Sequence, residues 1–328
     1  MSLLRFFAAA LVALGLAVSQ QAAAQQARTL KLGHSLAATS HYAAGANAFA
    51  EELAKRSNGR FKVEQFPSSQ LGGEREMIEG LQLGTLDLVV TSTGPVGNFV
   101  PETLITDIPF LFRNYDHARA VLDGPIGQEI LAKFPKHGLV ALAWWENGFR
   151  HLTNSKRAVN GPEDMHGLKV RTMENQVHMT AFRTIGALPT PMAFPELLTA
   201  LQQGTVDGQE NPIPVIVSAK LAQMQKYLSL TGHVYSPALL LVAPSLWSEL
   251  SDADKKIFLE AAKVGAQENR RFVNQVEQNG LAELRAAGMQ IVESVDNSKF
   301  QAALGPAYAE YAKRFGEANI ARIRDYKP

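Results

Sequence analysis

The chain has 328 residues, of which 46% are hydrophobic and 19% charged, and its formal net charge is +1. This length corresponds to about two domains at roughly 150 residues each, and the composition excludes disorder, a collagen-like chain and a small disulfide-stapled scaffold. The near-neutral charge argues against nucleic-acid binding through bulk charge. With no cysteine, the chain has no thiol nucleophile, thiolate metal ligand or disulfide.

The first 24 residues are typical of a cleaved export signal. Arg5 supplies a positive charge, residues 6–18 form an apolar run, and three alanines ending at Ala24 provide the small residues of a cleavage site. The apolar run is shorter than the ~20 residues that a transmembrane helix needs. We therefore predict a signal peptide over residues 1–24 and a periplasmic mature protein that is not embedded in the membrane.

Strand and helix patterns alternate through the rest of the chain, which predicts an α/β fold with largely parallel sheets. The expected strands cover residues 29–33, 61–66, 86–91, 139–145, 149–152, 169–172 and 188–190, and the expected shorter helices cover 41–57, 176–185 and 194–203. A helical stretch over 252–287, interrupted at Gly265 and Gly280, is long enough to brace both halves of the molecule. Two further helices are expected between residues 297 and 326.

One short motif occurs twice, 120 residues apart. Residues 76–87 (EMIEGLQLGTLD) and 196–207 (ELLTALQQGTVD) share Glu, Leu, Gln, Gly, Thr and Asp at equivalent positions. Each copy predicts a helix that ends at a glycine, followed by a turn into a strand. The repeat favours two related α/β lobes. We assign residues 25–147 and 236–275 to lobe I, and 148–235 and 276–328 to lobe II.

The motifs that mark common catalytic sites are missing from the sequence. It contains no nucleophile elbow, phosphate-binding glycine loop, HExxH zinc motif or dinucleotide fingerprint. No two of its eight histidines stand four residues apart, the helical spacing of paired metal ligands. We therefore expect no metal and no cofactor. An exported, two-lobed α/β protein without catalytic motifs is typical of a binding protein.

Two arginines near glycines are the candidate ligand-binding groups. Arg150 stands at the start of one predicted strand and Arg171 at the end of another, and the carboxyl ends of parallel strands face a ligand cleft. Arginine binds a carboxylate through two parallel hydrogen bonds. The alternative for each is a solvated surface charge. Asn211 precedes a proline and is either a turn residue or a ligand group, and Phe194 is placed either on the ligand or in the core.

Four segments in order along the chain resemble the solute-binding proteins of TRAP (tripartite ATP-independent periplasmic) transporters, of the dicarboxylate-binding type. They are residues 66–76 (FPSSQLGGERE), 167–171 (GLKVR), 189–194 (PTPMAF) and 206–212 (VDGQENP). The resemblance implies two α/β lobes, joined by crossing strands and a long helix, with a ligand cleft between them that closes over an organic anion.

The resemblance also implies roles for individual residues. Arg171 matches the arginine that binds the ligand carboxylate, and Arg150 matches the second family arginine. Asn211 matches the asparagine that orients the carboxylate, and Phe194 matches the aromatic residue that packs on the ligand. The partner that the resemblance implies is a TRAP membrane permease, to which the protein would deliver its ligand.

The first lobe is expected to contribute His34, Glu74 and Ser92, at positions that vary with substrate in the family. Together with Asn175, these side chains offer hydrogen bonds to ligand hydroxyls, and residues 91–95 (TSTGP) resemble the uronate-binding branch. A sugar acid such as a hexuronate is therefore the favoured ligand. The alternative ligand is a C4-dicarboxylate or small hydroxy acid, with Arg150 on the other carboxylate. The alternative function is a secreted enzyme acting on a sugar acid, with Glu74 and His34 as its acid/base pair.

Overall fold

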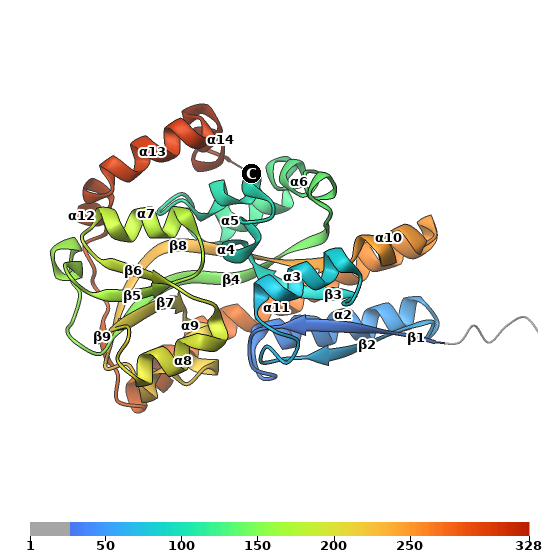
Figure 1. Cartoon of the computed structure of the whole chain (residues 1–328), viewed down its shortest axis with the longest axis horizontal. Coiled ribbons are helices and arrows are strands. Elements are labelled where there is room, and N and C mark those ends of the chain that lie inside the picture. Colours follow the sequence, from blue (N-terminus) through green and yellow to red (C-terminus); the bar gives the residue numbers. More distant parts are fainter. Residues whose placement is uncertain (1–26, 328) are drawn as a thin grey trace, which may run out of the picture.

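The computed structural model describes residues 27–327 (Figure 1); the predicted signal peptide lies outside them. The strands are β1 (Arg28–His34), β2 (Phe61–Phe66), β3 (Leu88–Ser92), β4 (Val140–Asn154), β5 (Lys169–Thr172), β6 (Leu188–Pro191), β7 (Gly208–Pro212), β8 (Tyr227–Val242) and β9 (Gln290–Val292). The shorter helices are α2 (His41–Arg56), α3 (Glu74–Leu83), α4 (Thr93–Val96), α5 (Tyr115–Asp123), α6 (Pro125–Leu131), α7 (Gln176–Thr184), α8 (Phe194–Gln202), α9 (Ile213–Ser218) and α10 (Pro244–Glu249). The long helix α11 (Asp252–Ala286) is followed by α12 (Asn297–Ala303), α13 (Gly305–Phe315) and α14 (Glu317–Arg324), and 3-10 turns η1 to η4 cover Pro101–Asp107, Phe134–His137, Pro162–Met165 and Leu221–Gln223.

The strands of the described residues form one sheet in the order β2-β1-β3-β8-β4-β7-β5-β6, with β9 beside β8. β1, β2 and β3 pair in parallel at one end, and β5, β6 and β7 pair in parallel at the other. The long strands β4 and β8 are antiparallel to each other and join the two groups (Figure 1). This architecture confirms the predicted α/β fold of two lobes joined by crossing strands.

The 120-residue repeat forms the same structure in both lobes. The glycines that follow α3 and α8 have φ values of 73° and 70°, which glycine adopts easily. Asp87 accepts a hydrogen bond from the backbone N–H of Lys31 in β1, and Asp207 accepts one from the N–H of Lys169 in β5, both at 2.9 Å. Each aspartate therefore ties its turn to the neighbouring parallel strand.

The hydrophobic core consists of two clusters. The larger one packs helices of the first half and of the C-terminal segment against the sheet, and the smaller one lies between α8, α9 and the end of α11. α2 shows how the sequence builds such a layer. It begins after Ser40, whose hydroxyl accepts a hydrogen bond from the N–H of Ala43, and it buries Phe49 and Leu53.

β4 is one continuous strand where the sequence predicted two, over 139–145 and 149–152. A bulge between Glu146 and Gly148 shifts its register against β8, and Gly148 has φ of 121°, a value that favours glycine. The strand therefore continues through Gly148, which lies between the two predicted strands. As a result, Arg150 lies inside a strand rather than at its start.

α11 also continues through its two glycines, contrary to the predicted interruptions. A Cβ atom on Gly265 would lie 2.5 Å from the ring of Trp145 and 2.9 Å from the carbonyl oxygen of Gly45 in α2. A Cβ atom on Gly280 would lie 2.7 Å from Ile213 in α9. Glycine at both positions lets the helix approach its neighbours closely. α11 thus contacts elements of both halves, as predicted for a brace.

The C-terminal segment contains three helices rather than the two expected, because Gly316, with φ of 81°, separates α13 from α14. α13 contacts α7. α14 contacts the first half of the chain, where Arg322 pairs with Glu129 at 2.6 Å and the imidazole of His117 donates to the carbonyl of Ile323 at 3.1 Å. The tail, assigned from sequence to lobe II, therefore contacts both halves.

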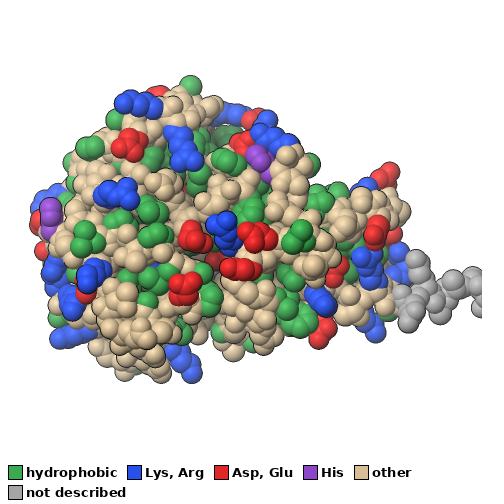
Figure 2. All heavy atoms as spheres, in the orientation of Figure 1, with side chains coloured by type: hydrophobic (Ala, Val, Ile, Leu, Met, Phe, Trp, Pro, Cys, Tyr) green, Lys and Arg blue, Asp and Glu red, His purple; other side chains and the backbone are tan. Residues whose placement is uncertain are grey.

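Within residues 27–327, the longest apolar stretches in helices are too short or too polar to span a bilayer. On the face shown in Figure 2, acidic and basic side chains are interspersed, in keeping with the net charge of +1. This face therefore carries no uniform field of one sign.

Replacing Gly265 with alanine is expected to destabilise the protein by roughly 1–3 kcal/mol, because the added methyl group overpacks the contact with Trp145 and α2. This loss outweighs the gain of about 1 kcal/mol in helix propensity. Gly305→Ala is the control, since a Cβ atom there meets nothing within 4 Å. Urea unfolding measures both. A Gly265→Ala variant as stable as the parent would contradict the close helix contact.

A half-buried carboxyl group behind the bulge, that of Glu277, makes stability depend on pH. Tyr115 donates its hydroxyl to Glu277 at 2.9 Å and accepts the N–H of Phe149 at 3.2 Å. Burial, with a smaller contribution from the charge of Glu146, raises the pKa of Glu277 to about 7. The unfolded value is about 4.3, so between these pH values the folded state holds a proton that the unfolded state has lost.

This group is expected to lower the free energy of unfolding progressively as pH rises from about 4 to about 7. Glu277→Gln keeps an oxygen for Tyr115 but does not titrate. The variant should therefore gain stability relative to the parent across this range. Urea unfolding at both ends of the range measures the difference, and a difference that is independent of pH would refute the assignment.

Candidate ligand-binding site

A cavity lies where the two halves of the molecule meet, and both halves contribute lining residues. Five of the eight residues expected at the site line it, from both halves: Glu74, Ser92, Arg171, Phe194 and Asn211. The other lining residues are Ser35, Leu36, Tyr42, Asn147, Met173 and Val215.

Arg171 in β5 is the cationic group of the cavity, and its side chain is only 1% exposed. Its Nε and Nη2 atoms donate to the carbonyl oxygen of Met192 at 3.1 and 2.8 Å, whereas Nη1 is buried and has no partner within residues 27–327. Burial, followed by the charge of Arg150, lowers the pKa of Arg171 to about 10, so the side chain stays protonated at neutral pH. A buried guanidinium with a free nitrogen is suited to bind an anion.

Glu74 supplies a carboxylate on the other side of the cavity from the first half of the chain. It is the first residue of α3, and its Oε1 atom accepts hydrogen bonds from the hydroxyl of Thr91 at 2.8 Å and the N–H of Ser92 at 3.3 Å. Burial raises the pKa of Glu74, and the charge of Arg171 partly offsets this shift. Glu74 and Ser92 together offer hydrogen-bonding groups that suit hydroxyls.

The repeat places lining residues at equivalent positions of the two lobes. Glu74 and Phe194 stand 120 residues apart, and each is the first residue of its helix, α3 or α8. Strands β3 and β7 are also offset by 120, which makes Thr91 the counterpart of Asn211. Phe194 packs near the guanidinium of Arg171, with 5.9 Å between the Cζ atom and the ring centroid. The two lobes thus present the same backbone frame with different side chains.

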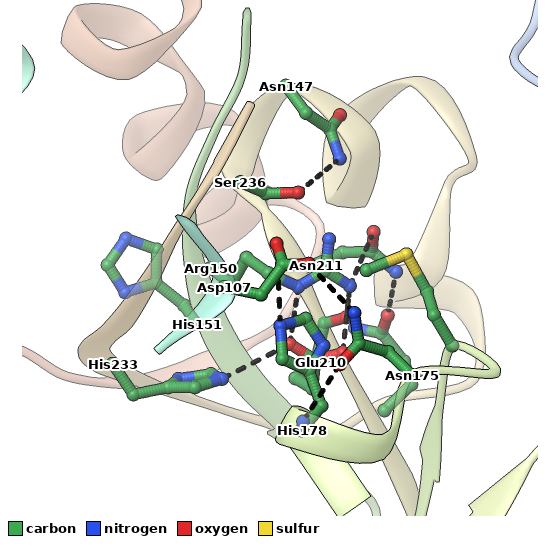
Figure 3. Close-up of polar contacts among 12 residues, drawn as sticks. Asp107, Asn147, Arg150, His151, Asn175, His178, Glu210, Asn211, His233 and Ser236 are labelled. Carbon is green, nitrogen blue, oxygen red and sulfur yellow. Dashed lines mark hydrogen bonds and ion pairs between the residues drawn. The ribbon is translucent and has the colours of Figure 1, made fainter. Parts of the chain in front are cut away.

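Arg150 does not line the cavity, although the sequence assigned it to the ligand. It is fully buried in β4 and pairs with the carboxylate of Glu210, with Nη2 at 2.8 Å from Oε1 (Figure 3). Burial opposes ionisation of Glu210, but the charge of Arg150 and the hydrogen bonds from His233 and Arg150 together outweigh it and hold the pKa of this carboxyl below its usual range. Nη2 also reaches Oδ1 of Asn211 at 3.3 Å, while Nη1 has no partner among the described residues.

His34 and Asn175 also lie outside the cavity lining. His34 is fully buried at the end of β1, and burial lowers its pKa to about 4, so its ring is neutral at pH 7. The ring contacts Tyr42 edge-on, and within residues 27–327 no hydrogen bond joins it to Glu74. Asn175 caps α7, and its Nδ2 atom donates to Asp107 at 2.8 Å.

Sequence patterns missed six of the lining residues. Asn147 could not be found because it lies in the bulge of β4, where its side chain contacts His41 at 3.1 Å and donates to Ser236 at 3.5 Å. Met173 could have been predicted from the sequence, because it stands two residues after Arg171 and therefore lies on the same side of an extended chain.

Within the part of the chain that the structure describes, no group of three His, Asp or Glu side chains is placed to hold a metal ion.

A cavity between two α/β lobes, lined by a buried arginine and hydrogen-bonding groups, defines a class of extracytoplasmic solute-binding proteins. The family model of DctP, the bacterial extracellular solute-binding proteins of family 7, matches residues 32–314. The chain belongs to this family, which confirms the resemblance found in the sequence. It is a solute receptor for an organic anion.

Solved structures of similar proteins contain such anions. A TRAP periplasmic solute-binding protein from Polaromonas sp. JS666, bound to D-erythronate, is 60% identical, with a TM-score of 0.90 over 92% of this chain and 99% of that chain. One from Bordetella bronchiseptica, with density assigned to pantoate, is 59% identical, with the same TM-score and coverage. The sugar acid-binding protein DctPAm from Advenella mimigardefordensis, in complex with galactonate, is 34% identical, with a TM-score of 0.88 over 91% and 97%.

Proposed function

We propose that this protein is a periplasmic receptor that binds a small hydroxylated monocarboxylate, of the size of erythronate or pantoate, and delivers it to a TRAP membrane permease. In this proposal the export signal ends near Ala24 and the receptor does not transform its ligand. The observation that carries the choice of ligand is the free, buried Nη1 atom of Arg171 in a cavity that also contains Glu74.

The charges at the cavity favour one carboxylate on the ligand. Among the described lining residues, Arg171 is the one Lys or Arg side chain, so a second carboxylate of the ligand would have no cation to pair with. Arg150, the expected partner of a second carboxylate, already pairs with Glu210. These contacts favour a monocarboxylate over a C4-dicarboxylate. Asn211, held by Arg150, would orient the carboxylate on Arg171.

The ligands of similar solved structures favour a smaller acid than the hexuronate that the sequence suggested. The two similar structures near 60% identity contain erythronate and pantoate. Glu74, Ser92 and Asn147 would then bind the ligand hydroxyls, and Phe194 would cover its carbon chain.

We also propose that the lobes divide at the bulge of β4, between residues 147 and 148 and between 235 and 236. Gly148 pairs with Ser236 across the two long strands, so both boundaries lie at one level of the sheet. This supports lobes of residues 25–147 with 236–275 and 148–235 with 276–328, which would close over the ligand by hinge motion.

A thermal-shift screen tests the class of ligand. A ligand at 100 times its dissociation constant adds ~2.7 kcal/mol to the folded state. D-Erythronate or pantoate is expected to raise the melting temperature, and succinate is not. Stabilisation by succinate alone would contradict the monocarboxylate proposal, and stabilisation by glucuronate alone would restore the hexuronate. Mass spectrometry of the recovered acid should show it unchanged, because turnover would mean an enzyme.

Arg171 is expected to be the main determinant of affinity. Arg171→Lys keeps the charge but loses the planar fork, which holds the carbonyl of Met192 with Nε and Nη2 and leaves Nη1 for the carboxylate. A hydrogen bond to a charged group contributes about 1.5–3 kcal/mol. Binding should weaken roughly 10- to 150-fold. Arg171→Ala should weaken it further, because the carboxylate would be desolvated without a partner.

Calorimetric titration with D-erythronate measures both variants. Lys169→Ala is the matched control, because Lys169 is a cation on the same strand but is exposed. An Arg171→Ala affinity within threefold of the parent would remove this residue from the site.

A further inference from the structure

The turn between β5 and α7 contacts the first half of the chain, and two of its three residues, Glu174 and Asn175, do so outside the cavity. Asn98, which is exposed, donates its Nδ2 hydrogen to the carbonyl oxygen of Glu174 at 2.6 Å. Neither residue lines the cavity. This hydrogen bond therefore joins the two proposed lobes without reaching the space that a ligand would occupy.

The next residue of the turn makes a second, buried connection. Asn175 donates to Asp107 at 2.8 Å, and its amide also lies 3.4 Å from the carbonyl of Gly94 (Figure 3). Asp107 in turn accepts the hydroxyl of Thr93 at 2.6 Å. Asp107 is thus held by its own lobe while it binds the opposite one.

Met173 begins the turn and packs against the same segment. A Cβ atom on Gly94 would lie 2.5 Å from the Sδ and Cε atoms of Met173, so the absence of a side chain at Gly94 permits this contact. The Sδ atom of Met173 also lies 3.4 Å from the hydroxyl of Ser92. All three residues of the turn are therefore in contact with residues 92–107 of the first half.

We propose that Asn98 and Asp107 on one lobe, and Glu174 and Asn175 on the other, form a clasp that stabilises the closed form and sets how long a ligand stays bound, without touching it. The proposal rests on the proposed function and on the lobe division. The observed affinity includes the equilibrium between open and closed forms. Weakening the clasp lowers the equilibrium constant for closure. The affinity for every ligand therefore falls by the same factor.

Asn98→Ala tests the clasp at its exposed contact. Asn98 also donates to the carbonyl of Pro95 at 3.3 Å within its own lobe. Loss of the one neutral hydrogen bond that it makes between the lobes should speed dissociation of D-erythronate about three- to tenfold, with little change in the association rate. The affinity ratio between D-erythronate and pantoate should not change, whereas a residue in contact with the ligand would shift it. Asn319→Ala is the matched control, an exposed asparagine that donates to the carbonyl of Phe315 at 2.8 Å within the tail. Stopped-flow kinetics measure all three proteins, and an Asn98→Ala variant with the dissociation rate of the parent would overturn the proposal.

A second measurement tests the contact between the lobes directly, with and without D-erythronate. The chain has no cysteine, so the double variant Asn98→Cys with Glu174→Cys carries the only two thiols. Under mild oxidation these are expected to form a disulfide, at a rate that D-erythronate increases. Single-cysteine variants control for bonds between molecules. If the parent binds neither acid, the proposed function fails while the crosslink still reports the contact; if no disulfide forms, the clasp is wrong.

Discussion

The two long antiparallel strands β4 and β8 are the constraint on which the rest of the structure depends. They pair with each other along most of their length, and each also pairs with a strand of one lobe: β8 with β3, and β4 with β7. Because β4 and β8 connect the parallel strands of the two lobes, their pairing fixes how β3 and β7 face each other. The helices that follow these strands, and the side chains at the start of α3 and α8, take their positions from this pairing.

The repeat explains why a cleft between such lobes binds an asymmetric ligand. Duplicated turns place Glu74 and Phe194 at corresponding points, yet one is an acceptor and the other an apolar ring. The guanidinium of Arg171 has no basic counterpart among the lining residues of the first half that the structure describes. Two lobes with similar backbones thus line the cavity differently. One contributes the guanidinium of Arg171 and the ring of Phe194, and the other contributes the acceptor oxygens of Glu74.

The features that could be predicted from the sequence are those that depend on residues close together along the chain. Gly-Thr-x-Asp turns, helix caps and strand periodicity depend on neighbouring residues, and the lobes, the long helix, and the positions of Arg171 and Asn211 followed from them. Contacts between distant segments were not predictable. Gly265 indicates a helix break until α2 is seen against it, and Asn147 reaches the cavity only because of a bulge set by pairing with β8. His34 was assigned by resemblance, and the structure places it beside Tyr42, outside the lining.

The anchor of Arg171 has a consequence for how such a receptor diverges. Two of its nitrogens are held by the main-chain carbonyl of Met192, and a main-chain atom persists whatever side chain occupies that position. The position of this proposed anion-binding group therefore does not depend on the other side chains of the cavity. In the proposed binding mode, single substitutions at Ser35, Leu36 or Val215, natural or engineered, would change which acid is recognised. The carboxylate of the new acid would still bind Arg171.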